Sequence, residues 1–156
     1  MGEAIFYHLT MRPLEAALPE LLEKTLERGW RAVVRCGSVE RVGALDKLLW
    51  TYRDESFLPH GVAGDGPAER QPIYLTAGPE LPNAPQLLFL VDGADASPKE
   101  MASFERCCLM FDGNDPAMVA KAREAWKSAT GGGLPAVYWA QDDRGRWVKK
   151  TEAKPA

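Results

Sequence analysis

The residues best suited to chemistry or binding gather in two segments, one near the middle of the chain and one near its end. In the first, residues 44–67, Trp50, Phe57, Pro59 and His60 follow one another at a helix end and in the loop after it. A solvated connector is usually polar, because an exposed aromatic side chain leaves apolar surface in water. The aromatic loop therefore predicts a surface that a partner covers.

The phase of the helix before this loop places Trp50 beside its buried face. Val42, Leu45 and Leu49 form one apolar stripe, and at ~100° per residue Trp50 falls about 100° from the centre of that stripe. An indole in this position, with Phe57 just beyond it, can anchor a protein partner. The alternative is that Trp50 and Phe57 fold inward as a satellite cluster under the loop.

The second segment is a helix late in the chain. Val119, Arg123 and Trp126 lie near one of its faces, with Lys127 beside them, so two cations flank an indole. Such a pocket can hold a peptide carboxylate and an aromatic side chain together. The alternative is a core tryptophan beside ordinary solvated charges.

Signals for catalysis, cofactors and metals are poor. Gly64-Asp65-Gly66-Pro67 begins like a phosphate-binding glycine loop, but Glu69 stands at the third glycine position and Pro67 lacks an N–H donor. Asp92 ends an apolar strand without a phosphate loop, and Ser56 with His60 lacks the strand-to-helix turn of a hydrolase. The two histidines and three cysteines lack metal-site spacing. We therefore expect no cofactor and no metal.

Charge is distributed unevenly along the chain. The formal net charge is -3, but residues 1–120 hold 11 basic and 18 acidic groups while residues 121–156 hold 8 basic and 4 acidic groups. The basic end suits nucleic acid or an acidic peptide. Three cysteines in apolar stretches indicate buried thiols and a reducing cytoplasm, and the absence of long apolar runs indicates neither export nor membrane spanning.

The order of elements predicts an α/β fold. We expect a single domain over residues 1–141, with a mostly parallel sheet flanked by helices on both faces and a nucleotide-binding-like topology that lacks a nucleotide site. A polar basic tail, residues 142–156, should be frayed except for one extended segment near Trp147. The expected strands are 5–10, 32–36, 73–76, 87–91, 107–111 and 136–140, and the expected helices are 13–28, 38–50, 97–105 and 115–129.

Both aromatic segments occur in an order that resembles one protein family. The motifs that carry the resemblance are Phe6-Tyr7, Leu45-Asp46, Leu49-Trp50, Ser56-Phe57-x-Pro59-His60, Gly64-Asp65-Gly66-Pro67 and Arg123-Glu124-x-Trp126-Lys127. Together they resemble the chi subunit family of bacterial DNA polymerase III over nearly the whole chain. The segment from Trp50 to Pro67 is the specific part, because short apolar strands match many α/β proteins.

The resemblance implies a non-catalytic replication adaptor in the cytoplasm. Family members pair with the small psi subunit, which links them to the clamp loader, and bind the acidic, Phe-terminated tail of single-stranded-DNA-binding protein. By resemblance, psi or a helicase would contact Trp50, Phe57, Pro59 and His60. The tail would contact the late helix, through Val119, Arg123, Trp126 and Lys127. Val119 stands where some members carry a basic residue. DNA would be reached only indirectly.

Two rival hypotheses remain at this stage. One is a nucleotide-dependent or hydrolytic α/β enzyme built around Asp92 or the loop from Gly64 to Pro67. The other is direct binding of single-stranded DNA through Trp126, Trp147 and the basic tail. The acidic charge of residues 1–120 disfavours the second.

Overall fold

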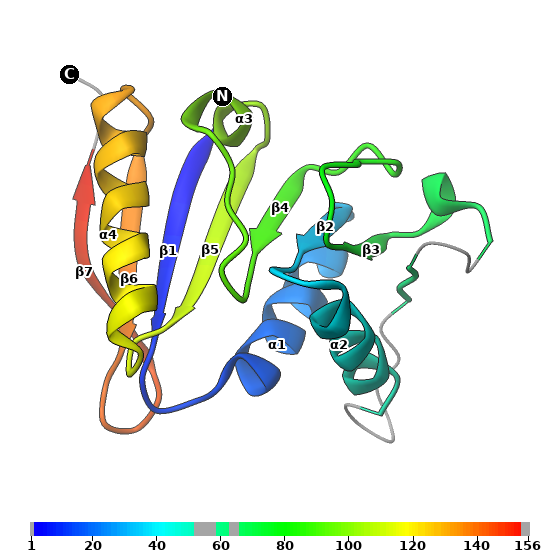
Figure 1. Ribbon diagram of the computed structural model, residues 1–156, viewed down its shortest axis with the longest axis horizontal. Helices are drawn as coiled ribbons and strands as arrows, with labels where there is room; N and C mark the ends of the chain where they lie inside the picture. The colour runs from blue at the N-terminus through cyan, green and yellow to red at the C-terminus, as the bar shows by residue number, and fades with distance from the viewer. Residues whose placement is uncertain (1, 52–58, 63–65, 154–156) are drawn as a thin grey trace.

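One mixed sheet organises the protein. The computed structural model describes residues 2–51, 59–62 and 66–153 (Figure 1). Within these residues seven strands form one sheet in the order β3-β2-β4-β5-β1-β6-β7, and every neighbouring pair is parallel except β6 with β7. The predicted α/β fold with a mostly parallel sheet is confirmed.

The elements follow the expected order along the chain. The strands are β1 Glu3–Leu9, β2 Ala32–Arg35, β3 Ile73–Thr76, β4 Leu87–Leu90, β5 Arg106–Asp112, β6 Ala136–Gln141 and β7 Trp147–Ala153. The helices are α1 Leu14–Glu27, α2 Val39–Thr51, the short 3-10 helix Ala68–Arg70, α3 Pro98–Ala102 and α4 Pro116–Gly131.

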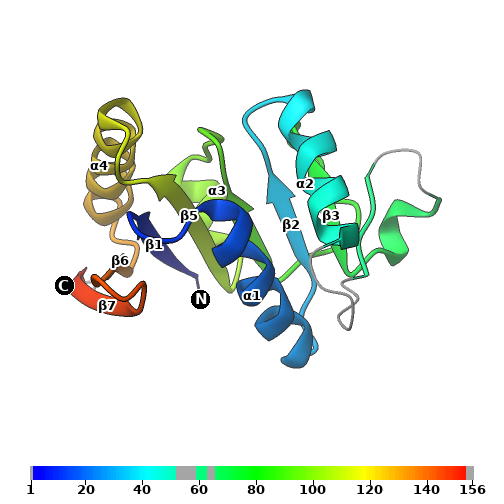
Figure 2. The ribbon, with the colours of Figure 1, turned by 90° about the horizontal axis from the view of Figure 1, so that it is seen from below.

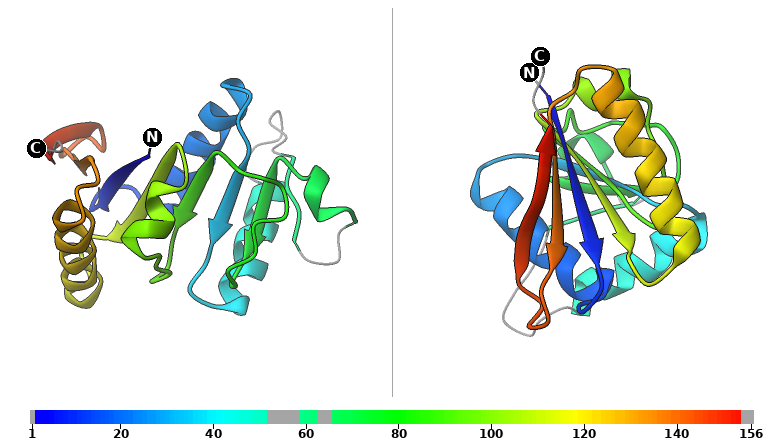
Figure 3. Two further views of the ribbon diagram at one scale, coloured as in Figure 1. Left: turned by 90° about the horizontal axis from the view of Figure 1, so that it is seen from above. Right: turned by 90° about the vertical axis from the view of Figure 1, so that its left-hand side faces the viewer.

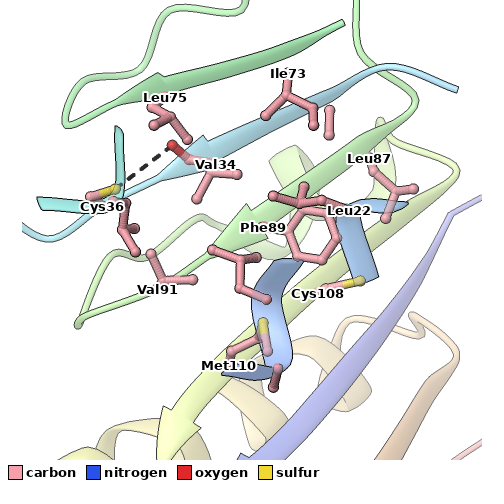
Figure 4. Close-up of a cluster of buried hydrophobic side chains, with 14 of the residues drawn as sticks. Leu22, Val34, Cys36, Ile73, Leu75, Leu87, Phe89, Val91, Cys108 and Met110 are labelled. Atoms are coloured by element: carbon pink, nitrogen blue, oxygen red, sulfur yellow. Dashed lines mark hydrogen bonds between the residues drawn. The ribbon is translucent and has the colours of Figure 1, made fainter. Parts of the chain in front are cut away.

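Helices cover both faces of the sheet, as predicted. The views in Figures 2 and 3 place α1 and α2 on one face and α3 and α4 on the other. Figure 4 shows the core on the α1 side, where Leu22 of α1 meets Phe89 and Cys108 of the sheet. The inner strand β4 is buried at every position. Burial on both faces explains why the strand candidates appear as continuous apolar runs.

The end of the chain differs from the expected frayed tail. Residues 147–153 form β7, which pairs antiparallel with β6 and includes the extended segment predicted near Trp147. The turn between the strands is held by Asp142, whose Oδ1 accepts hydrogen bonds from the N–H groups of Arg144 and Arg146 at 2.9 Å. The extended segment near Trp147 is therefore confirmed, and it continues as a strand to Ala153, where a frayed tail was expected because a polar outer strand gives no apolar signal. The domain boundary at residue 141 stays a prediction.

An ion pair between a buried arginine and a half-buried glutamate joins the sheet to a helix. Helix α3 begins as expected at Ser97, whose Oγ accepts from the N–H of Glu100 at 3.1 Å, but ends at Ala102 rather than 105. The Glu100 carboxylate binds the buried Arg35 guanidinium through contacts of 2.9 and 3.0 Å. These hydrogen bonds from Arg35 lower the pKa of Glu100. The pair ties the end of β2 to α3.

The three cysteines are buried and free, which confirms the expected thiols. Burial raises the pKa of Cys36 and of Cys107 to about 12, and burial also raises that of Cys108. All three thiols are therefore protonated and unreactive near neutral pH. Among the described residues, no helix has the length and apolar character needed to cross a membrane.

Candidate protein-binding surfaces

The first candidate surface, the α2 surface, consists of Trp50, Pro59 and His60 at the carboxyl end of α2. Leu45 and Leu49 face the core and are each 1% exposed, whereas Trp50 is 54% exposed. The helical phase therefore predicted correctly that Trp50 lies off the buried stripe, and Trp50 does not fold inward. Phe57, assigned to the same surface, lies outside the described residues.

His60 lies beneath Trp50 and holds it in place. The two ring centroids are 4.9 Å apart, and His60 is only 5% exposed. Its Nε2 atom lies 3.0 Å from Oδ1 of Asp46, one turn before Trp50 on α2. The adjacent Gly61 donates its N–H to the Ile73 carbonyl oxygen at 2.9 Å, so this segment is tied to β3. His60 is thus a support for the indole rather than an exposed contact.

The second candidate surface, the α4 surface, consists of Val119, Arg123, Trp126 and Lys127. Helix α4 begins at Asp115, whose Oδ1 accepts from the N–H groups of two residues in its first turn at 3.0 and 3.4 Å. Arg123 and Lys127 are exposed, whereas Val119 and Trp126 are half-buried. The structure therefore places the four predicted residues on one helix, with two cations outside and an indole beneath.

Trp126 packs edge-on against the sheet. Its ring centroid lies 5.2 Å from that of Phe6 on β1 and 5.9 Å from that of Tyr138 on β6. The hydroxyl of Tyr138 lies 2.6 Å from Nδ1 of His8. Burial raises the pKa of Tyr138, and the positive charge of Arg123 acts in the opposite direction. The alternative of a core tryptophan thus holds for the indole of Trp126, which packs against the sheet. The cations Arg123 and Lys127 beside it are exposed to solvent.

No pattern in the sequence singles out Tyr138 and His8, although both residues adjoin the α4 surface. Both lie on parallel neighbouring strands, and the register pairs Phe6 with Tyr138 and His8 with Ala140. Residues two apart on a strand share a face, so the alternation along each predicted strand indicates which side chains lie on the α4 side of the sheet. To bring Tyr138 and His8 together, one must also know that β1 and β6 are neighbouring strands.

At the sheet edge where nucleotide-binding folds hold phosphate, the backbone N–H groups bind a side chain of this protein instead. A cavity of about 440 Å³ lies at the carboxyl ends of β1 and β5, where the following helices leave to opposite faces. Ligands of open α/β sheets bind at such a point. Here the N–H groups of Thr10, Met11 and Arg12 donate to one atom, Oε1 of Gln141, at 2.9, 2.9 and 3.0 Å. These donors are engaged by a neutral side chain, and the described residues show no nucleotide site.

Asp92 is held by an ion pair. Its Oδ2 atom lies 2.9 Å from Nε of Arg41, which also contacts Glu15 at 3.0 Å. The hydrogen bond that Arg41 donates to Asp92 raises the pKa of Arg41. Within the part of the chain that the structure describes, no cluster of three or more His, Cys, Asp or Glu is arranged to hold a metal ion. Residues 63–65 of the glycine loop, and Ser56, lie outside the described residues.

The hypothesis of one DNA surface made of Trp126 and Trp147 is contradicted by the geometry. Trp126 contacts Phe6 in the core on the α4 side. Trp147 instead contacts Tyr7 in the core on the α1 side. Neighbouring residues of a strand point to opposite faces, so the two indoles lie on opposite sides of the sheet.

Comparison with known families decides between the remaining interpretations. Residues 1–136 match the family described as DNA polymerase III chi subunit, HolC. The chain belongs to the DNA polymerase III chi subunit family. This confirms the resemblance expected from the motifs, and with it membership in a family of accessory rather than catalytic polymerase subunits.

Two curated relatives carry the chi name. The probable DNA polymerase III subunit chi of Rickettsia prowazekii (strain Madrid E) is 30% identical over 95 residues, which cover 61% of this chain and 58% of the relative. The DNA polymerase III subunit chi of Escherichia coli (strain K12) is 35% identical over 82 residues, which cover 48% of this chain and 56% of the relative. The chain thus matches less than two thirds of the length of either relative.

Proposed function

We propose that the protein is a non-catalytic adaptor in cytoplasmic DNA replication. Its α4 surface binds the acidic C-terminal tail of single-stranded-DNA-binding protein. Its α2 surface holds the psi subunit, which links the complex to the clamp loader, or a helicase in place of psi. The observation that carries the proposal is the arrangement of α4, where exposed Arg123 and Lys127 border the half-buried indole of Trp126.

The chemistry of the α4 surface suits a tail that ends in phenylalanine. The guanidinium of Arg123 can pair with a carboxylate in two parallel hydrogen bonds, and Lys127 adds a second charge. Lys127 has only a weak competitor, since its Nζ atom lies 3.6 Å from Oε1 of the equally exposed Glu124. The half-buried Val119 and Trp126 offer apolar area for the terminal ring. Exposed charged contacts of this kind weaken as salt rises.

The chemistry of the α2 surface is different and suits an apolar partner. An indole that is 54% exposed, held from below by a buried histidine, loses little conformational freedom when a partner covers it. Tryptophan is among the residues most often found as binding hot spots. A helix of a partner protein that covers Trp50 would therefore gain affinity mainly from burial of apolar surface.

Calorimetric titration with a synthetic acidic peptide, with and without its terminal phenylalanine, tests the α4 assignment. We expect the complete peptide to bind more tightly, and Arg123→Ala to weaken binding by about 1–3 kcal/mol because a charged hydrogen bond is lost. Arg144→Ala, which removes an exposed arginine from the β6–β7 turn, is the matched control and should have no effect. Equal affinity for both peptides, or equal effects of the two variants, would rule the assignment out.

Affinity capture from the source cell tests the α2 assignment. The wild-type protein should retain a psi-like partner or a helicase, and Trp50→Ala and Phe57→Ala should both lose the same partner. Val39→Ala is the matched control, because Val39 is 74% exposed on the same helix. Loss of the partner with Val39→Ala alone, or retention with all three variants, would show that the partner binds elsewhere.

A further inference from the structure

The sheet has an uncovered groove on the α1 side. Helix α1 lies over the middle of the sheet, and in the described residues no helix covers the same face of β1, β6 and β7 (Figures 2 and 3). A groove of about 440 Å³ runs there, with α1 along one side and the β6–β7 hairpin along the other. It lies on the face opposite to α4, so it is distinct from the α4 surface.

Three of the five tryptophans of the chain line this groove. They come from three separate segments: Trp30 follows α1, Trp139 lies on β6 and Trp147 lies on β7. All three are half-buried. The ring of Trp147 packs against Tyr7 on the floor of the groove, with centroids 4.9 Å apart. The groove therefore offers several flat aromatic groups to one ligand.

Four cations line the same groove. The guanidinium carbons of Arg28 and Arg106 lie 5.2 and 5.6 Å from the centroid of the Trp30 ring, and Nζ of Lys149 lies 6.0 Å from that of Trp139. Lys24 of α1 is the fourth. This places a positive charge next to the indoles on both sides of the groove.

The cations are only partly neutralised. Arg106 pairs with Glu3 at 3.0 Å, and Lys149 with Glu152 at 3.8 Å. Among the described residues, Lys24 and Arg28 have no carboxylate within 4.0 Å. The groove thus keeps an excess of positive charge, although residues 1–120, which supply Lys24, Arg28 and Arg106, are acidic on average.

We propose that this groove binds a short segment of single-stranded DNA. Aromatic platforms combined with cations along a groove are the arrangement with which proteins hold single strands, because unpaired bases stack on the rings while phosphates meet the charges. Duplex DNA hides its bases from such rings. An acidic peptide would satisfy the cations, but three indoles and a tyrosine exceed what one aromatic anchor requires.

One side of the groove lies after the residues that match the family. The family model covers residues 1–136, whereas Trp139, Trp147 and Lys149 all lie after it. Strand β7 completes the groove on the side opposite to α1. The proposed contact is independent of the α4 and α2 surfaces and would hold DNA directly, next to the indirect route through single-stranded-DNA-binding protein.

Fluorescence titration of the full chain with an oligothymidylate of roughly eight nucleotides tests the proposal. We expect quenching of tryptophan emission at low salt, with affinity that falls as salt rises. The double variant Lys24→Glu with Arg28→Glu should weaken binding at least tenfold. Trp139→Leu, which keeps every charge, should weaken it about fivefold or more through lost stacking. Circular dichroism of each variant checks that the fold is kept.

The matched control is the double variant Arg123→Glu with Lys127→Glu on the opposite face, which makes the same change in net charge. It should bind oligothymidylate within about twofold of wild type while losing the acidic tail peptide, so the two assignments fail separately. If both double variants weakened oligothymidylate binding equally, the change in net charge alone would explain the loss of affinity. The proposal is overturned by that result, by binding of duplex DNA with equal affinity, or by binding of a mixed Glu/Phe peptide in the groove without any binding of oligothymidylate.

Discussion

The α2 and α4 surfaces each present a tryptophan on a helix, but at different depths. Trp50 is 54% exposed and rests on His60, whereas Trp126 packs edge-on against Phe6 and Tyr138. Their positions relative to the buried residues of their helices differ: at ~100° per residue, Trp50 lies about 100° from Leu49, whereas Trp126 lies about 40° from Ala122. Helical phase therefore turns Trp126 toward the sheet and Trp50 away from it.

The residues that face the sheet set this depth. Helix α2 meets the sheet through Leu45 and Leu49, whose large side chains fill the space beneath it. Helix α4 instead buries Ala122 and Ala129, so a flanking tryptophan can reach the sheet. The comparison teaches that helical phase sets the direction of each tryptophan, and that small inward residues let a helix bring a flanking indole close to the sheet.

The largest expected effect tests whether the two surfaces belong to one rigid body. Arg35 ends β2, which leads into α2, and Glu100 lies on α3, on the same face as α4. We predict that Glu100→Ala lowers the free energy of unfolding by about 3 kcal/mol, at the low end for a broken buried pair, because the buried Arg35 loses its carboxylate but keeps its backbone carbonyl partners. Urea denaturation followed by circular dichroism and by tryptophan fluorescence should give coincident transitions. Separate transitions would mean that the two surfaces unfold independently.

The same pair predicts an acid dependence. The pKa of Glu100 is lowered by hydrogen bonds from Arg35, so the charged carboxylate stabilises the folded state above the ordinary glutamate pKa. This stabilisation is lost as pH falls below about 4.5 and through the lowered folded-state pKa. In Glu100→Gln the acid dependence of stability should be weaker than in the wild type. An unchanged pH profile would contradict the assignment.

The next effect separates the two tryptophans directly. Trp126→Ala should lower the free energy of unfolding by about 2–3 kcal/mol, somewhat less than the ~3–5 kcal/mol typical of a fully buried aromatic residue. Trp126→Phe keeps a ring against Phe6 and Tyr138 and should recover most of this loss. Chemical denaturation measures both values. A loss below about 0.5 kcal/mol for Trp126→Ala would show that the indole packs no more closely than Trp50.

Trp50→Ala should behave in the opposite way. Because its ring is more than half exposed, we expect a change in unfolding free energy of about 0.5 kcal/mol or less. The same variant should lose the partner captured by the wild-type protein. Comparing its denaturation midpoint with that of Val39→Ala provides the control. A stability loss as large as that of Trp126→Ala would place Trp50 in the core instead.

The smallest effect concerns the cation beside Tyr138. Burial raises the pKa of Tyr138, while Arg123 opposes that rise by favouring the phenolate. Arg123→Ala should therefore raise the pKa of Tyr138 further, which an ultraviolet absorbance titration can follow with Tyr138→Phe as the reference. Lys127→Ala is the comparison variant, since no influence of Lys127 on Tyr138 is found. An unchanged pKa would show that Arg123 does not act on the Tyr138 hydroxyl.

Local sequence patterns predicted most of the fold because each signal lies within one element. Apolar runs marked six strands, and Ser97 and Asp115 marked two helix starts, with the caps found in the structure. Strand β7 was predicted only as an extended segment, because its polar side chains give no period. Its pairing depends on the turn at Asp142 and on the edge offered by β6.

Local sequence patterns predicted less of the candidate sites than of the fold. Exposure of Trp50 follows from helical phase, but its support by His60 depends on a contact with Asp46, which lies 14 residues earlier in the chain. The burial of Trp126 depends on the register of β1 and β6. The groove of Trp30, Trp139 and Trp147 joins three distant segments, so no single window of the sequence could reveal it.

The position of β1 has a consequence for synthesis of the chain. Although β1 comes first in chain order among the described strands, it pairs only with β5 and β6. At ribosomal rates of ~5–20 residues per second, β1 waits roughly 5–20 s before Arg106–Asp112 has been synthesised. During that interval its apolar edge is open to incorrect pairing with other nascent chains. Slow emergence of the central strand pair therefore makes the yield of folded protein sensitive to temperature and to chaperones during expression.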